Sequence, residues 1–356
     1  MDRVAVVGAG PIGLTAALEL AALDIPSVVL EAKPQLEPVG SRAIVLAHDA
    51  LATFRRLGCE EVPRKGVRLT RARTYLGETE LFAREFPPTL PDGLPTFVNL
   101  QQTYTEQALL RRAEQSEHIE VHFNAPVTDL GELDAEYVIG ADGAHSTVRK
   151  LLGVDFPGKS FDDRFLIADI RAELPFPRDE RRFFFDPPSN PGRQILIHPQ
   201  PDGEWRIDWQ APPDTDPEER LDDRIRALVG DTPYELVWLT AYRFHSRLAS
   251  RFRVGRVFLA GDAAHLMAPF GARGMNSGVE DATALAKAIA SGDLDAYEQE
   301  RRPAAIENLR ITGATMRFMA PPTALHRLWR NAILRGSLRV PRLRRFVNSG
   351  KLPTPK

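Results

Sequence analysis

The sequence is poor in cysteine, with Cys59 as its only one in 356 residues. A single cysteine excludes an internal disulfide framework and any metal cluster held by several cysteines, and we expect no metal site. Scarce cysteine is typical of proteins from a reducing compartment, so we expect a cytoplasmic protein.

Long apolar runs and a concentrated charge of one sign are also missing. No stretch reaches the roughly 18 apolar residues of a membrane span. A strand is expected from residue 3 onward, which leaves no room for a signal peptide. Lysine and arginine (46) nearly balance aspartate and glutamate (48). Arginine is spread along the chain without a basic patch, so a nucleic-acid partner is not expected.

Glycine is concentrated at the start of the chain, in "VAVVGAGPIGLTAALELA". The pattern predicts an apolar strand over residues 4–7, a tight turn and a helix. Gly8, Gly10 and Gly13 fit G-x-G-x-x-G. In that motif the first glycine permits the turn, the second lets the backbone approach a pyrophosphate, and the third lets helix and strand pack closely. The positive end of the helix dipole then faces the anion.

An acidic residue follows at the spacing that this motif requires. The next strand, "SVVLE", ends at Glu31, 18 residues after Gly13. A carboxylate there accepts hydrogen bonds from ribose hydroxyls and repels a 2′-phosphate. The sequence therefore predicts a site for the adenosine of FAD or NAD rather than of NADP.

A second glycine-rich stretch, "GDAAHLMAPFGARGMNSG", begins at residue 261. It follows an apolar strand and enters a helix expected from about Asn276. Asp262 can bond ribityl hydroxyls, and the N–H groups around Gly274, Met275 and Asn276 can stabilise negative charge on a reduced flavin. Because a flavin must be held by segments distant from the first loop, the two loops are predicted to hold opposite ends of one FAD.

Three segments together carry a family resemblance: "GAGPIG", "ADGAHSTVRKLLG" and "GDAAHLMAPFGARGMNSGVEDA". In order and spacing they resemble the FAD-dependent aromatic hydroxylases, the para-hydroxybenzoate hydroxylase group of flavoprotein monooxygenases. The likeness covers most of residues 1–320. The tail "MRFMAPPTALHRLWRNAILR" looks most like the branch that hydroxylates phenylpropionates, polyketides and antibiotics. Larger members add a thioredoxin-like C-terminal domain, and we expect none in this chain.

The resemblance implies a set of cofactor residues. It places Arg42 and Gln102 near the FAD pyrophosphate and ribityl chain, and the backbone of Pro269 beside the flavin ring. The DG segment around Asp142 is implicated in both nucleotides. The expected cofactor residues are Gly8, Gly10, Pro11, Gly13, Glu31, Ala32, Lys33, Arg42, Gln102, Asp142, Gly143, Gly261, Asp262, Pro269, Gly274, Met275 and Asn276.

The sequence departs from the family pattern in two places. Gly271-Ala272-Arg273-Gly274 stands where many relatives read Gly-Gly-Gln-Gly, so Arg273 brings an unexpected cation near the cofactor or solvent. Asp49 stands where relatives often carry arginine.

The expected fold is of mixed α/β class, with a Rossmann-like FAD-binding domain into which a β-sheet substrate domain is inserted. The FAD domain is expected over 1–70, 96–160 and 248–320, the substrate domain over 71–95 and 161–247, and a helical tail over 321–356. "RQILIHP", Asp202-Gly203 and "EWRIDWQ" predict a hairpin. Its tryptophans would share one face with Ile207, and a helical stripe in "EERLDDRIRALVG" would cover one face of the sheet.

Pocket residues are less well specified by the sequence. His48 and His198 are candidates for contact with substrate, whereas the resemblance gives His265 a structural place under the second loop. At most two rings of the "FFF" run at 183–185 can share a face, because consecutive strand residues point to opposite sides. A pocket base that deprotonates a phenol would help the reaction. The sequence identifies neither that base nor the sheet face that lines the pocket.

The implied function is an NAD(P)H- and FAD-dependent monooxygenase. It would insert one oxygen atom from O₂ into a phenolic or polyketide-like aromatic molecule through a flavin C4a-hydroperoxide, with FAD held non-covalently and NADPH or NADH as a transient co-substrate. Baeyer–Villiger or epoxidation chemistry and a non-catalytic flavin-containing binding protein are the alternatives. A monomer and a homodimer both stay open, as do the substrate and the position that is hydroxylated.

Overall fold

The computed structural model describes residues 3–36, 43–319, 321 and 323–343. The chain forms two compact units, each assembled from three separate stretches. The first unit comprises Met1–Arg64, Leu100–Lys159 and His245–Arg310. The second unit comprises Lys65–Asn99, Ser160–Phe244 and Ile311–Lys356.

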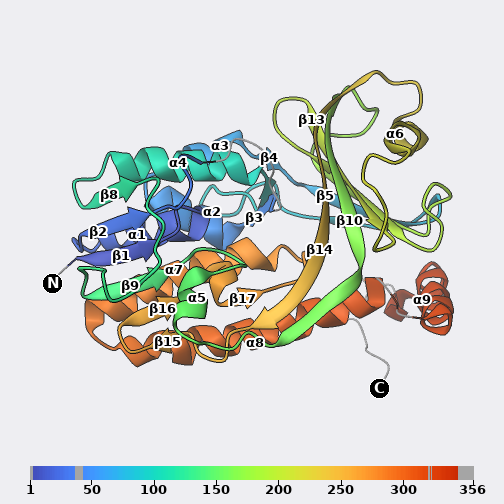
Figure 1. Ribbon diagram of the computed structural model, residues 1–356. Helices are drawn as coiled ribbons and strands as arrows, with labels where there is room; N and C mark the ends of the chain where they lie inside the picture. Colours follow the sequence, from blue (N-terminus) through green and yellow to red (C-terminus); the bar gives the residue numbers. More distant parts are fainter. Residues whose placement is uncertain (1–2, 37–42, 320, 322, 344–356) are drawn as a thin grey trace. The chain divides into compact units, whose positions relative to one another are not determined.

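The first unit contains a six-stranded sheet in the order β15-β16-β9-β1-β2-β8. Pairing is parallel from β16 to β8, and only β15 runs antiparallel to its neighbour. Figure 1 shows β9, β1, β2 and β8 side by side. The strands are β1 (Val4–Val7), β2 (Ser27–Leu30), β8 (Ile119–His122), β9 (Tyr137–Gly140), β15 (Arg253–Val254) and β16 (Val257–Leu259). Every residue of β1 is buried, as expected for a central parallel strand.

Helices and short elements complete the first unit. They are α1 (Pro11–Ala21), β3 (Val45–Ala47), α2 (His48–Arg56), α3 (Glu61–Lys65), α4 (Gln102–Glu114), α5 (Thr147–Leu151), the 3₁₀ turn η1 (Gly261–Ala263), β17 (His265–Leu266), α7 (Arg273–Ser291) and α8 (Leu294–Met319). The last residues of α3 and α8 belong to the second unit. Within the described ranges, no helix combines the length and the apolar character needed to cross a membrane.

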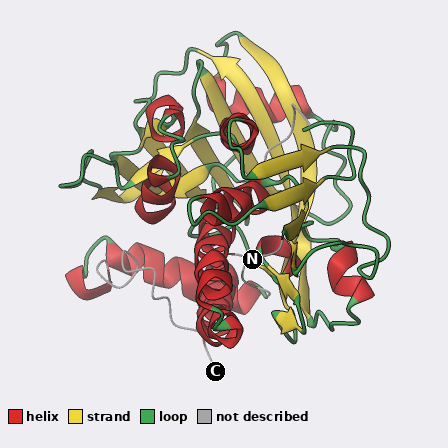
Figure 2. Cartoon of the chain, turned by 90° about the vertical axis from the view of Figure 1, so that its left-hand side faces the viewer, coloured by secondary structure: helices red, strands yellow, loops and turns green. Residues whose placement is uncertain are grey.

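The second unit is built on seven neighbouring strands, β14-β10-β13-β12-β11-β5-β6, of an eight-stranded sheet. The eighth strand, β17, pairs with Arg247 and Leu248 at the end of β14, and both partners belong to the first unit. Its long strands are the large yellow arrows in the upper part of Figure 2. The pairing of β11 with β5 is parallel, and β13 pairs antiparallel with both of its neighbours, β10 and β12. The elements are β4 (Val67–Arg68), β5 (Arg71–Leu76), β6 (Thr79–Glu85), β7 (Phe97–Asn99), β10 (Gly158–Ala172), β11 (Glu180–Phe185), β12 (Gln194–Pro199), β13 (Glu204–Ala211), α6 (Leu221–Val229), β14 (Tyr234–Leu248) and α9 (Ala324–Ser337). The mixed α/β class with a Rossmann-like sheet is confirmed.

The predicted hairpin is confirmed as β12 and β13. Asp202 and Gly203 have φ of 59° and 79°, the left-handed values of a type I′ turn. The N–H of Glu204 donates to the Pro201 carbonyl at 3.1 Å and closes the turn. A glycine and an aspartate tolerate these angles better than most residues, so the local sequence decides the register of the hairpin.

One face of this sheet is the apolar core of the second unit. Trp205, Ile207 and Trp209 are at most 1% exposed and point into it. The stripe expected on α6 is also confirmed, because Ile225 is fully buried in this cluster and Leu221 and Leu228 pack against it. Figure 1 shows α6 beside β13. We call this side the apolar face and its opposite the polar face.

The "FFF" run divides between the two faces, as expected. Phe184 packs against the apolar cluster and stacks on Tyr75, with ring centroids 4.6 Å apart. Phe183 and Phe185 share the other side, with centroids 4.7 Å apart.

Candidate functional site

The three glycines of the first loop have different surroundings: two are tightly packed against backbone atoms and one faces open space. Gly8 has φ of 107°, and a Cβ there would lie 2.6 Å from the Ala141 carbonyl oxygen. A Cβ on Gly13 would lie 1.9 Å from the Gly8 carbonyl oxygen. A Cβ on Gly10, by contrast, would meet no heavy atom of the described chain within 4 Å. The fold itself therefore requires Gly8 and Gly13, while Gly10 faces open space at the start of α1, where a ligand can approach.

Glu31 lies at the end of β2 and is tied to that loop. Its carboxylate accepts hydrogen bonds from the N–H groups of Ala9, at 2.9 Å, and Lys33, at 3.0 Å. A carboxylate has lone pairs for about four hydrogen bonds, so two acceptor positions remain for ribose hydroxyls. Ala32 and Lys33 are exposed directly beside it.

The two glycine-rich stretches meet in space through Ile12. A Cβ on Gly261 would lie 2.9 Å from Ile12 Cγ1, and a Cβ on Gly278 would lie 2.6 Å from Ile12 Cδ1. A side chain at either position would crowd the Ile12 side chain of α1, which lies against η1 and α7. The loops are about 250 residues apart in the chain, yet they share one packing contact.

The helix after the second loop begins earlier than expected. It starts at Arg273 rather than about Asn276, because Ala272 takes the left-handed conformation, with φ of 55°, and turns the chain into α7. In the described structure no side chain caps this end, which leaves the first N–H groups of the helix without a side-chain acceptor. Gly274 and Met275 lie in this first turn, where the helix dipole is positive.

The side chain of Asn276 has a role that the sequence did not reveal. Its Oδ1 accepts the N–H of Ala47 at 2.9 Å, and its Nδ2 donates to the Val45 carbonyl at 3.1 Å. This amide therefore holds β3 against α7. Its side chain is structural, and only its backbone is available at the helix end.

The DG segment caps the start of α5. Asp142 Oδ2 accepts the N–H groups of Thr147, at 2.7 Å, and Val148, at 3.0 Å. Its other oxygen, Oδ1, is buried and has no hydrogen-bond partner in the described chain. Arg149, 6% exposed, donates to the carbonyls of Ala263 and Ala144 and so ties the DG segment to η1. Burial lowers the pKa of Arg149, and Asp142 partly opposes this shift.

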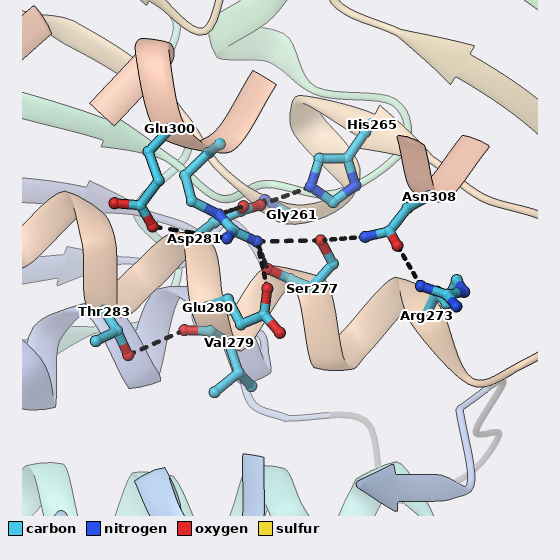
Figure 3. Close-up of polar contacts among 11 residues, drawn as sticks. Gly261, His265, Arg273, Ser277, Val279, Glu280, Asp281, Thr283, Glu300 and Asn308 are labelled. Carbon is cyan, nitrogen blue, oxygen red and sulfur yellow. Dashed lines mark hydrogen bonds and ion pairs between the residues drawn. The ribbon is translucent and has the colours of Figure 1, made fainter. Parts of the chain in front are cut away.

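A buried ionic cluster contacts the start of the second glycine-rich loop at Gly261 (Figure 3). His265 Nε2 lies 2.6 Å from Asp281 Oδ2, and Arg301 Nε donates to Asp281 Oδ1 at 2.9 Å. Asp281 Oδ2 also accepts the N–H of Gly261 at 3.1 Å. The side chains of His265 and Asp281 are completely buried. The structural place expected for His265 is therefore confirmed.

Charges in this cluster stabilise one another. Burial alone would lower the pKa of His265, but the adjoining Asp281 carboxylate outweighs it and raises that pKa. Burial alone would raise the pKa of Asp281, but His265 and Arg301 outweigh it and lower that pKa.

The two departures from the family pattern have partners in the chain. Arg273 Nη1 donates to Asn308 Oδ1 on α8, as Figure 3 shows. Asp49 is 84% exposed and lies 3.1 Å from His48 Nδ1. His48 begins α2, with 30% of its side chain exposed.

The remaining expected cofactor residues that the structure describes lie in two separate segments of the first unit. Asp262 and Pro269 are exposed, and Gln102 begins α4 with its Nε2 donating to Glu106 at 2.7 Å. Arg42 lies outside the described residues. His198 belongs to the second unit, where it is buried on β12.

These features fit a bound FAD. The open side of Gly10 at the start of α1 suits a pyrophosphate, and the uncapped start of α7 suits the flavin edge that becomes negative on reduction. The unpartnered Asp142 Oδ1 supplies a further acceptor.

Comparison with known proteins agrees with this geometry. The family model described as FAD binding domain matches residues 1–312. A flavin-dependent monooxygenase of Mycobacteroides abscessus is 32% identical over 87% of this chain and 73% of its own length. A 3-(3-hydroxy-phenyl)propionate/3-hydroxycinnamic acid hydroxylase of Mycobacterium sp. (strain KMS) is 31% identical over 97% of this chain, which spans only 64% of that relative.

A solved structure is also closely similar. The p-nitrophenol 4-monooxygenase of Pseudomonas putida DLL-E4 superposes with a TM-score of 0.83 at 27% identity, covering 98% of this chain and 97% of that one. The resemblance to the FAD-dependent aromatic hydroxylases is thereby confirmed. With two glycine-rich loops that meet in one unit and a match along most of its length, this chain belongs to the FAD binding domain family.

Proposed function

We propose that the protein is an FAD-dependent monooxygenase that uses NAD(P)H and O₂ to insert one oxygen atom into a small aromatic molecule. The observation that carries this proposal is the junction of the two glycine-rich loops at Ile12, which brings a pyrophosphate-type helix end and a second, uncapped helix end into one unit. The names of the relatives, a hydroxyphenylpropionate hydroxylase and a nitrophenol monooxygenase, support the aromatic substrate class.

The first unit is proposed to hold FAD and the second to hold the substrate. The start of α1 at Gly10 and Pro11 would bind the pyrophosphate, and Glu31 would accept the adenosine ribose hydroxyls. Asp262 would accept hydrogen bonds from the ribityl chain. The backbone N–H groups of the first turn of α7 would lie at the flavin edge.

A bound flavin would supply the redox chemistry, which is acceptance of a hydride from NAD(P)H and activation of O₂. The residues of the chain bind the cofactor, orient the substrate and stabilise charge on the reduced flavin. The N–H groups at the start of α7 favour negative charge at the ring edge, because helix N-termini attract anions. The ionic cluster of His265, Asp281 and Arg301 is buried, and its hydrogen bond from the Gly261 N–H gives it the role of fixing η1 in place.

Labelled oxygen tests the proposal. The holoenzyme is incubated with NADPH or NADH, ¹⁸O₂ and a panel of phenols, phenylpropionates and polyketide aromatics, and the products are weighed by mass spectrometry. We expect one labelled oxygen in the product and faster NAD(P)H oxidation when substrate is present. If all oxygen consumed with the whole panel is recovered as H₂O₂, the protein is an oxidase or a binding protein and the proposal is wrong.

A further inference from the structure

The polar face of the second unit carries buried groups that the fold leaves unsatisfied. His198 lies directly opposite Arg206 in the pairing of β12 with β13, and Asp208 follows Arg206 on the same face. His198 Nδ1 and Asp208 Oδ1 are buried without a hydrogen-bond partner in the described chain. Both polar side-chain atoms of Gln200, just beyond β12, are unsatisfied in the same way. Such groups are costly to bury unless a partner from outside the chain satisfies them.

Arg206, unlike these groups, already has a carboxylate partner within the chain. It is 1% exposed, and its Nε and Nη2 donate to the two oxygens of Asp169 at 2.7 and 2.6 Å. This bidentate pair joins β13 to β10 at directly opposed positions. The Asp169 charge is therefore already matched, whereas His198 on the neighbouring β12 and Asp208 further along β13 each keep an unsatisfied atom.

Arg181 provides a cation on that side. In β11, Arg182 pairs with Ile197, which points into the apolar face, so Arg181 points to the polar face beside His198. No carboxylate within the described ranges pairs with Arg181; the charged group that acts on it is Arg84, and both burial and Arg84 lower its pKa. An arginine without a carboxylate, next to an unsatisfied histidine, favours an anionic oxygen as its partner.

The protonation of His198 and Asp208 suits proton uptake. Burial, together with Arg181 and Arg206, lowers the pKa of His198 to about 3, so the imidazole is neutral near pH 7. Burial raises the pKa of Asp208 to about 7, with Arg206 opposing the shift and Asp169 adding to it. His198 Nε2 and Asp208 Oδ2 are 3.7 Å apart. A modest side-chain rotation would bring them within hydrogen-bond distance, as often happens when a substrate binds.

We propose that His198 and Asp208 take up the proton of a phenolic hydroxyl while Arg181 holds the resulting phenolate oxygen. The polar face is then the site for the ionisable end of a hydroxylated aromatic substrate. This inference rests on the proposed function and names the base that the sequence does not identify.

The proton transfer balances without any further reactant. The phenolic O–H donates its proton to His198 Nδ1, and the proton on His198 Nε2 passes to Asp208 Oδ2. Phenol and aspartate become phenolate and aspartic acid, and the imidazole ends neutral in its other tautomer. No electrons are transferred. The phenolate ring is richer in electrons than the phenol, which favours attack on an electrophilic oxygen. His198 touches the substrate, whereas Asp208 acts through His198 as a positioning residue.

A chromogenic phenol makes the step visible without turnover. The FAD-loaded protein is titrated with 4-nitrophenol, whose neutral and ionised forms absorb at different wavelengths, and with 4-nitroanisole, which has no proton to give. For the wild type we expect bound 4-nitrophenol to appear as phenolate at a lower pH than in free solution, and to bind more tightly than 4-nitroanisole. Absence of 4-nitrophenol binding, or binding equal to that of 4-nitroanisole, overturns the inference.

Three variants assign the roles. With His198→Gln, bound 4-nitrophenol should stay neutral; with Asp208→Asn, the change in ionisation near pH 7 should be lost while binding persists. Arg181→Gln should weaken phenolate binding about tenfold to a hundredfold, the loss of a hydrogen bond to a charged group. Asp162→Asn is the matched control, because Asp162 lies in the same unit with its side chain 98% exposed.

The two levels of proposal fail in different ways. If all three variants ionise bound 4-nitrophenol with the wild-type pH profile, the inference is wrong even where labelled oxygen enters a product. If the variants behave as expected but no substrate gains oxygen from ¹⁸O₂, the phenol site stands and the monooxygenase proposal falls.

Discussion

Replacing Asp281 by asparagine tests whether the buried ionic cluster holds the second loop in place. The substitution keeps the shape of the side chain and removes its charge, leaving Arg301 with 7% and His265 with none of its side chain exposed. Removing one partner of a buried ion pair typically costs about 3–5 kcal/mol, because the remaining charge is uncompensated. We expect Asp281→Asn to lower the free energy of unfolding of the first unit by an amount in this range.

The control removes a second carboxylate from the same arginine. Glu280 Oε2 accepts a hydrogen bond from Arg301 Nη2 at 2.7 Å, but its side chain is 49% exposed. Exposed ion pairs contribute about 0–1 kcal/mol, so Glu280→Gln should be nearly silent.

The assay can follow each unit by its own signal. All four tryptophans, Trp205, Trp209, Trp238 and Trp329, lie in the second unit. During denaturant unfolding, tryptophan fluorescence therefore reports on the second unit, and the fluorescence of released flavin reports on the first. Asp281→Asn should move the flavin-detected midpoint to lower denaturant and move the tryptophan-detected midpoint less. A flavin-detected midpoint equal to that of the wild type would refute the reasoning.

The pH dependence gives an independent check. The raised pKa of His265 means that its contribution is complete below its ordinary value of 6.5 and is lost as the pH rises through the folded-state pKa. The lowered pKa of Asp281 means that its contribution is present above its ordinary value of 3.8 and is lost as the pH falls through the folded-state pKa. The stability difference between wild type and Asp281→Asn should therefore be largest between these limits and shrink at either extreme.

Four further outcomes are expected. Gly10→Ala should fold normally, since Gly10 has an ordinary extended conformation with open space around it, but it should bind FAD more weakly. Gly13→Ala should instead give little soluble protein, because its Cβ would lie 1.9 Å from the Gly8 oxygen. Equal FAD affinities for Gly10→Ala and wild type in a titration of the apoprotein would contradict the first. Asp262→Ala should weaken FAD binding by about 1–3 kcal/mol in the same titration, through loss of an acceptor for ribityl hydroxyls, and an unchanged affinity would remove Asp262 from the site. Purified protein should be yellow and release its flavin on acid precipitation, whereas flavin that stays in the pellet would show a covalent link.

The local sequence was sufficient to predict the structure wherever a few neighbouring residues decide the backbone conformation. The strand at Val4–Val7, the turn through Gly8 and the hairpin turn at Asp202-Gly203 follow from backbone angles that only certain residues adopt readily. The alternation of tryptophan with charged residues on β13 likewise fixed which side is apolar, because strand side chains alternate. The start of α7 was misplaced, since it depends on Ala272 adopting a left-handed conformation that alanine rarely takes.

Only the tertiary structure decided which distant residues meet. Ile12 fits against Gly261 and Gly278, and Asp281 joins His265 to Arg301, although no local pattern links these positions. On the second unit, the strand order places Arg181 and Asp208 around His198, and the register determines that all three share the polar face. Periodicity states which side of its own strand a residue occupies, but the neighbours across the sheet depend on pairings between segments that are far apart in the chain.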